Sequence, residues 1–157
     1  MSKIKVSFDD PAHGWVRLVI TSDSQSIGIS ASYIYNSFYG LVDALCHLHK
    51  PTGTSVLGQQ QETVVWMSEP AEAEMRFVRR GDLITLDILW FSDSRRSEFG
   101  QPNPEMSISG SYDEVALPFW RALRNLQSRF PAAQFEAHWQ APFPTREMAL
   151  LTAALGK

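Results

Sequence analysis

Residues 62–91, ETVVWMSEPAEAEMRFVRRGDLITLDILWF, decide the fold of this chain. Polar and apolar residues alternate there in three runs, and this period of two is typical of half-buried strands. The runs are 62–69, 72–80 and 83–91. Pro70 and Gly81 mark the corners between them, and Gly81 supplies the positive φ of a tight hairpin turn. Three neighbouring strands joined by short turns predict an antiparallel meander.

Further strands are expected on both sides of this segment. Residues 3–8 and 15–21 alternate in the same way, and residues 26–31 add a short third strand. Residues 92–105 are predicted to form a polar loop, and residues 106–110 a short edge strand.

Helical periodicity appears on both sides of the meander. Residues 37–49 carry one apolar stripe. Ser111 and Glu114 have the spacing of a capping box at the start of a helix over 112–130, which we expect to continue through Pro118 with a kink. This order of elements predicts an α+β fold, with a mainly antiparallel sheet of about five to seven strands, two main helices on one face and a C-terminal helix.

The C-terminal part of the chain differs in composition. Residues 131–144 contain three prolines and are predicted to form an extended connection. Thr145 is expected to cap a last helix over 146–155. We therefore expect a single α+β domain over 1–130 and an extension over 131–157 that packs on the same domain or on a partner subunit.

Composition and charge restrict the class of protein. The 157 residues are 44% hydrophobic and 20% charged, with a net charge of −3, which excludes a disordered chain and gives no basic excess for nucleic-acid binding. The longest apolar runs are far shorter than the ~20 residues that span a bilayer, and residues 1–6 lack the apolar core of a signal peptide. The single cysteine, Cys46, fits a reducing compartment. We expect a cytoplasmic protein that binds neither nucleic acid nor membrane.

Motifs for catalysis are missing from the sequence. There is no phosphate-binding glycine loop and no nucleophile elbow. His47 and His49 are two residues apart, so on a helix they point to different sides instead of chelating one metal. Cys46 precedes His47, but adjacent helical residues point about 100° apart, which disfavours a catalytic dyad. We therefore expect no catalytic residue, no metal site and no cofactor.

Charged and aromatic residues around strand 83–91 are the candidates for a partner-binding surface. Acidic side chains on a solvated edge strand and on the following loop would pair with a basic partner, and arginine and aromatic side chains would anchor the interface. The candidates are Glu69, Glu72, Glu74, Trp90, Phe91, Asp93, Arg95, Arg96 and Glu98. Asp87 stands apart, among apolar neighbours in mid-strand, and Arg76 or Arg79 is its expected partner.

Aromatic residues are numerous enough to suggest either a large core or an exposed surface. Six of them are hard to bury at the same time: Trp15, Tyr33, Tyr35, Tyr39, Trp139 and Phe143. Core packing would account for them, and so would an aromatic surface that meets a partner.

The layout of residues 3–130 resembles that of small bacterial cytosolic α/β proteins, which include immunity proteins of polymorphic-toxin and contact-dependent inhibition systems. The resemblance lies in the opening strands, helix 37–49, VVWMSEP at 64–70, the hairpin at 80–82 with strand 83–91, and helix 112–130. It assigns no site residue. It implies a non-enzymatic protein-binding module, an immunity-type inhibitor that occludes a toxin domain. The alternatives are a small ligand-binding or enzymatic domain with an aromatic pocket, and a homo-oligomer or homodimer that uses the helix at 145–156.

Overall fold

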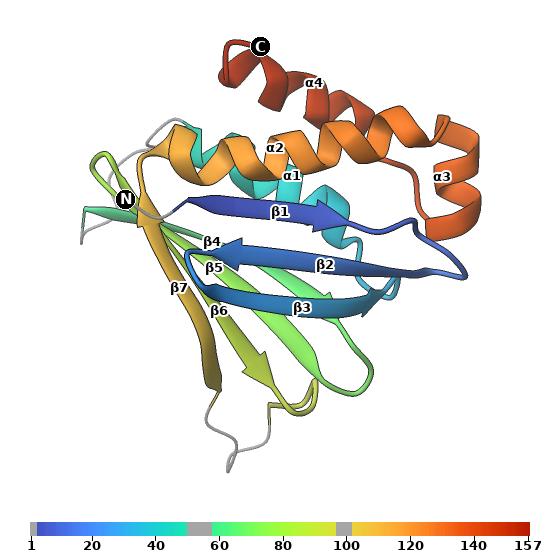
Figure 1. Cartoon of the computed structure of the whole chain (residues 1–157), viewed down its shortest axis with the longest axis horizontal. Helices are drawn as coiled ribbons and strands as arrows, with labels where there is room; N and C mark the ends of the chain where they lie inside the picture. The colour runs from blue at the N-terminus through green and yellow to red at the C-terminus, as the bar shows by residue number, and fades with distance from the viewer. Residues whose placement is uncertain (1–2, 50–57, 97–101) are drawn as a thin grey trace.

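Seven strands form one antiparallel sheet in the computed structural model, which describes residues 3–49, 58–96 and 102–157. The strands lie side by side in the order of the sequence, from β1 to β7 (Figure 1). They are β1 (Ile4–Phe8), β2 (Trp15–Ser22), β3 (Gln25–Ser32), β4 (Gln59–Met67), β5 (Glu72–Arg80), β6 (Leu83–Phe91) and β7 (Asn103–Gly110). The predicted meander and its turns at Pro70 and Gly81 are confirmed.

Four helices lie within the described ranges and accompany the sheet. They are α1 (Ser37–His49), α2 (Tyr112–Arg129), α3 (Ala132–Trp139) and α4 (Thr145–Ala154). α1 packs on β4, α2 runs alongside β1, and α4 packs on α1 (Figure 1). The predicted α+β class, with two main helices and a C-terminal helix, is confirmed.

The alternating strand residues build the core. In β2 the side chains of Val16, Leu18 and Ile20 are buried, as their spacing predicts, because side chains two apart share one face of a strand. An aromatic cluster lies at the centre. The ring of Phe38 on α1 lies 5.6 Å from Trp66 on β4 and 4.9 Å from Trp139 on α3.

The sheet opens strongly between its third and fourth strands. β2 and β3 pair over their whole length, whereas β3 and β4 pair only at Ser32 and Met67. β1 to β3 therefore run in a different direction from β4 to β7 (Figure 1). The far end of β3 turns toward β7, where the Gln25 side chain donates a hydrogen bond of 2.6 Å to the backbone oxygen of Glu105. The result is a curved sheet that surrounds part of its own core.

The predicted extended connection over 131–144 is wrong, because the segment contains α3. The prolines lie outside this helix, and Pro131 precedes its first residue. Alanine-rich sequence favours the helical turns between them, and burial of Phe135 and Trp139 stabilises the helix in its place. Gln140 ends the helix in the left-handed conformation, with φ of 73°. The extension thus packs on the core of its own chain.

The helix starts show one confirmed prediction and one error. Ser111 and Glu114 form the reciprocal hydrogen bonds of a capping box, and α2 continues through Pro118 as expected. Thr145 does not cap α4, because Pro144 occupies the N-cap position and Thr145 is already the first helical residue. β7 begins at Asn103, three residues before the predicted start, so the preceding loop is shorter than expected.

Candidate functional site

Two of the predicted binding residues, Glu72 and Glu74, lie inside the protein. They belong to β5, which pairs with β4 on one side and β6 on the other, so the expected solvated edge strand is wrong. Both residues are almost fully buried, with 3% and 5% of their surface exposed. Ionised carboxylates at such depth need partners, because burial removes their hydration.

Arg96 supplies those partners from the turn after β6. Its Nε donates to Glu72 Oε1 at 2.7 Å, and its Nη1 lies 2.8 Å from Glu74 Oε1. Arg76 Nη2 donates to the other oxygen of Glu74, also at 2.7 Å. The guanidinium carbon of Arg96 lies 3.9 Å from the centre of the Phe91 ring. These four charged residues form one internal network, which we call the carboxylate–arginine network.

The network determines the charge state of Glu74. Burial by itself raises the pKa of this carboxyl group, but the hydrogen bonds from Arg96 and Arg76 outweigh burial, and the pKa lies below its ordinary value. Glu74 is therefore ionised, and both of its carboxylate oxygens already contact arginine side chains of the same chain. Its role here is to hold the turn after β6 against the sheet.

The other predicted binding residues are dispersed. Glu69 is exposed at the β4–β5 corner, where its backbone has a positive φ of 48°. Trp90 is half-buried, Phe91 is buried under Arg96, and Arg95 is exposed. Asp93 accepts a backbone hydrogen bond from Arg96 in the turn. Glu98 lies outside the described residues.

Asp87 does not use the predicted arginine partners. It lies opposite Arg76 in the β5–β6 register, but its carboxylate accepts a hydrogen bond of 2.6 Å from the Ser107 hydroxyl on β7. Arg76 points to Glu74 instead. Arg79 donates to the last carbonyl oxygens of α1, those of Leu48 and His49, where a cation also stabilises the negative end of the helix dipole. The sequence could not show which of several carboxylates each arginine meets.

The thiol and imidazole groups do not form a reactive set. Burial raises the pKa of Cys46 to about 11, so its nucleophilic thiolate is scarce near neutral pH. His47 Nδ1 lies 3.4 Å from Asp43 and 3.7 Å from Glu62 on the surface. Across the described parts of the chain, no group of three or more His, Cys, Asp or Glu side chains is arranged to hold a metal ion.

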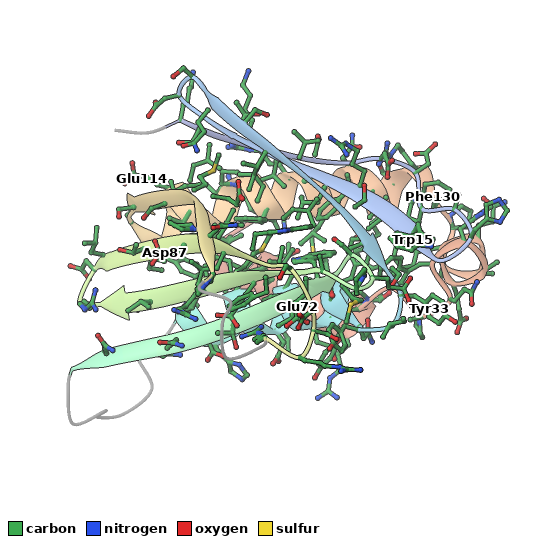
Figure 2. All side chains as sticks on the ribbon, turned by 90° about the horizontal axis from the view of Figure 1, so that it is seen from below. Trp15, Tyr33, Glu72, Asp87, Glu114 and Phe130 are labelled. Atoms are coloured by element: carbon green, nitrogen blue, oxygen red, sulfur yellow. The ribbon has the colours of Figure 1, made fainter. Side chains whose placement is uncertain are left out.

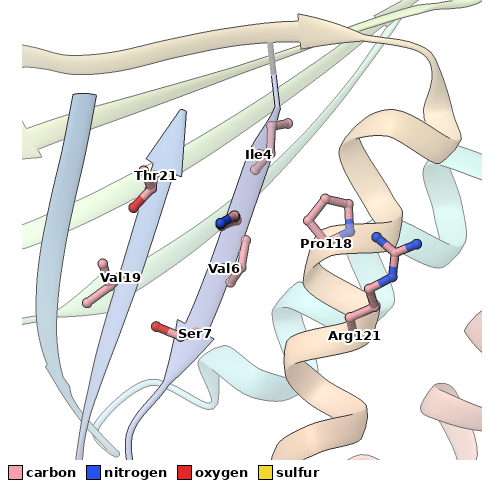
Figure 3. A pocket seen from close by; sticks show the side chains of 8 residues that line it. Ile4, Val6, Ser7, Val19, Thr21, Pro118 and Arg121 are labelled. Carbon is pink, nitrogen blue, oxygen red and sulfur yellow. The ribbon is translucent and has the colours of Figure 1, made fainter. Parts of the chain in front are cut away.

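A groove between β1 and α2 is one candidate site for a small ligand. Ile4 and Val6 face Pro118 across it (Figure 3), and the cavity measures about 420 Å³. Lys5 and Arg121 are the charged residues of its lining, which contains no carboxylate, imidazole or thiol among the described residues. It therefore offers cations and aliphatic surface, without a paired acid and base. The aromatic rings expected around a pocket pack against one another in the core instead.

The most exposed aromatic residues come from residues 33–39 and from Trp15 at the start of β2. Trp139 and Phe143 are buried, but the other four aromatic residues that are hard to bury remain at the surface, together with Ile34. We call this set the aromatic surface; its residues are Trp15, Tyr33, Ile34, Tyr35 and Tyr39, with exposed fractions from 37% to 52%. Figure 2 shows Trp15 and Tyr33 at the same end of the molecule. The sequence analysis identified the four aromatic residues of this surface as hard to bury, but it did not identify Ile34.

Backbone hydrogen bonds and a buried anchor hold the aromatic surface in place. The Tyr33 amide donates to the Gly14 oxygen at 2.8 Å, beside Trp15. The Ser37 hydroxyl, at the start of α1, donates to the Val65 oxygen on β4. Phe38, completely buried, anchors the segment between the exposed Tyr35 and Tyr39. The surface is therefore preformed, which lowers the entropic cost of binding.

The fold and the surface together define an α+β domain with a preformed, uncharged aromatic patch and a neutralised internal ion network. Comparison with protein-family models, with curated proteins and with solved structures returned no match. None of the helices in the described ranges is both long enough and apolar enough to cross a bilayer.

Proposed function

We propose that this chain is a non-enzymatic protein-binding module that uses the aromatic surface as its interface. The observation that carries the proposal is that five large apolar side chains, each at least 37% exposed, lie on residues 33–39 and on Trp15, whose neighbour Gly14 accepts the Tyr33 amide hydrogen bond. Exposed patches of this kind mark interaction sites, and tyrosine and tryptophan are enriched among the residues that dominate binding energy.

The charge around the surface suggests the chemistry of the partner. Asp43 is the only charged residue in the sequence from 33 to 46. Faces of tyrosine and tryptophan rings attract cations, and arginine is the cation most often found on them. A partner surface that presents arginine and lysine side chains among apolar ones would therefore fit. The buried glutamates of the carboxylate–arginine network are not needed for this attraction.

The finer proposal is an immunity-type inhibitor that occludes a toxin domain. It is supported by the resemblance of the predicted layout to that of small bacterial proteins of that kind and by the preformed surface. The mechanism would be steric: the aromatic surface docks on the toxin domain, and the body of the sheet covers the active site. No proton or electron transfer by this chain is required.

The experiment is co-expression with the toxin domain encoded by the neighbouring gene. We expect a stoichiometric complex on size-exclusion chromatography and protection of the cells. Replacement of Ile34, Tyr35 and Tyr39 by serine is expected to weaken the complex at least about tenfold, which corresponds to about 1.4 kcal/mol, because tyrosine is enriched among the few interface residues whose truncation costs about 2 kcal/mol or more. Leu83→Ser and Leu150→Ser remove equally exposed apolar side chains elsewhere and should leave affinity unchanged.

The outcomes separate the alternatives. Absence of both complex and protection would reject the inhibitor. A complex that the three serine substitutions leave intact would place the interface elsewhere. Self-association of the chain alone, lost in the same variant, would favour the homodimer. Met148 and Leu151 of the helix at 145–156 are buried in the chain's own core, so an oligomer formed through this helix would have to use its exposed residues, such as Leu150.

A further inference from the structure

We propose a second binding site, independent of the aromatic surface, at which an extended peptide segment of another protein pairs with β3 as an additional strand. One aliphatic side chain of the peptide would enter a cavity beneath β3. The proposal rests on three observations: an unpaired strand edge, an apolar cavity beside it, and the charges at the two ends of that edge.

The unpaired edge follows from the register of the β2–β3 hairpin. Ser22 and Gln25 close a two-residue turn, so backbone groups that bond to β2 alternate with groups that point away from it. Ser26, Gly28 and Ser30 belong to the second set. The Ser68 hydroxyl donates to the Ser30 oxygen from outside the hairpin, in agreement with this alternation. Within the described residues, the backbone N–H and C=O groups of Ser26 and Gly28 have no partner.

The cavity lies directly beneath this edge. Ile27 and Ile29 point into the protein, because they alternate with the outward-facing residues of β3. Ala73, Ile88 and Trp90 line the opposite side, and the volume is about 230 Å³. A cavity of about 150 Å³ accommodates benzene, so this one has room for a large aliphatic side chain. A peptide strand beside β3 would direct alternate side chains toward it.

β7 faces the same opening but is less suited to pairing. Pro104 has no N–H group, and the Glu105 oxygen already accepts the hydrogen bond from Gln25. Glu105 is also the extra residue of a bulge, since Ile88 pairs with Met106 while Leu89 pairs with Pro104. The edge available for a new strand is therefore that of β3.

Charge differs between the two ends of the site. Glu105 lines the cavity, and Asp87 lies with Glu105 in the adjoining hollow. Toward the other end, the Arg17 guanidinium lies over Gly28, where an added Cβ atom would collide with it, and its Nη1 lies 3.5 Å from the Ser30 hydroxyl oxygen. The peptide that fits best carries a basic residue toward Glu105, an aliphatic residue over the cavity and an acidic residue toward Arg17.

The test uses capped peptides in which valine or isoleucine alternates with serine, with lysine at one end and glutamate at the other, made in both orders. Binding to the full chain is measured by calorimetry. We expect one order to bind at least about tenfold more tightly than the other, and amide exchange at Ser26 and Gly28 to slow by a similar factor. No measurable binding of either peptide, or binding without this protection, would overturn the proposal.

Backbone chemistry provides the matched controls. N-methylation of the alternate peptide amides that face β3 should abolish binding, whereas methylation of the other set should be tolerated. On the protein, Ser26→Pro removes the outward N–H group at an edge position where proline is compatible with a strand, and Ser26→Ala keeps it. Equal affinity for both methylated peptides would refute strand pairing even if Ser26→Pro failed to fold. The serine substitutions of the aromatic surface should not affect this binding.

Discussion

Replacement of Arg96 by methionine tests whether the carboxylate–arginine network holds the turn after β6. The variant keeps most of the side-chain volume but leaves Glu72 without its arginine and Glu74 with Arg76 as its remaining arginine. A hydrogen bond to a charged group contributes about 1.5–3 kcal/mol, and the contact with Phe91 adds about 0.5–1 kcal/mol. Because Arg96 is 34% exposed, solvent screening reduces the sum, and we expect a loss of about 2–4 kcal/mol near neutral pH.

The same variant should show a distinctive pH dependence. In the wild-type chain the pKa of Glu74 is lowered, so its contribution to stability is present above the ordinary glutamate pKa and is lost as pH falls through the folded-state value. In Arg96→Met, Glu74 loses one of the two arginines that lower its pKa, so its carboxylate becomes protonated more readily, and protonation relieves the cost of its burial. The difference in unfolding free energy between the two proteins should therefore shrink as pH falls from about 7.5 to about 4.5.

Urea unfolding at the two pH values, followed by tryptophan fluorescence, measures this difference. Arg95→Met is the matched control, because Arg95 is the neighbouring residue and is exposed. The network does not hold the turn if Arg96→Met is no more destabilising than Arg95→Met, or if its cost is the same at both pH values.

Three further predictions concern the core, a helix start and the thiol. Trp139→Ala should cost about 3–5 kcal/mol in urea unfolding, because the side chain is fully buried against Phe38; a loss below about 1 kcal/mol would contradict the placement of α3. Ser111→Ala should cost about 1 kcal/mol by removing the N-cap of α2, whereas Ser111→Asn should restore most of it in the same titration. Burial raises the pKa of Cys46 to about 11, so at pH ~8 its thiol should react with iodoacetamide about 100-fold more slowly in the folded chain than in the urea-unfolded chain. Equal reaction rates in the two states would exclude this pKa shift.

Local periodicity was sufficient to predict the sheet and the two long helices. The sequence places Ile84, Leu86 and Ile88 at every second position. In β6 these three side chains are buried and the residues between them are half-buried, because the backbone of a strand fixes a side-chain period of two. The segment over 131–144 misled the same reasoning. Its prolines mark the ends of α3, and only contacts with distant residues such as Phe38 reveal that Phe135 and Trp139 belong to the core.

The charged residues were harder to place than the apolar ones. Glu72 and Glu74 alternate with apolar residues, which is equally typical of a solvated strand face and of a buried face supplied with arginines. The position of Arg96 decides whether this strand face is solvated or buried, and that position depends on a turn that lies 24 residues after Glu72 in the chain.

The contacts between Phe38 and Trp139 also bear on how the protein is made. The ring of Phe38 is synthesised early, but two of its neighbours, Phe135 and Trp139, leave the ribosome a hundred residues or so later. Until then, the nascent strands β1 to β4 hold an incomplete core that exposes apolar side chains to the surrounding chaperones. A pause in translation before residue 139 would therefore leave the growing polypeptide without its final packing partners.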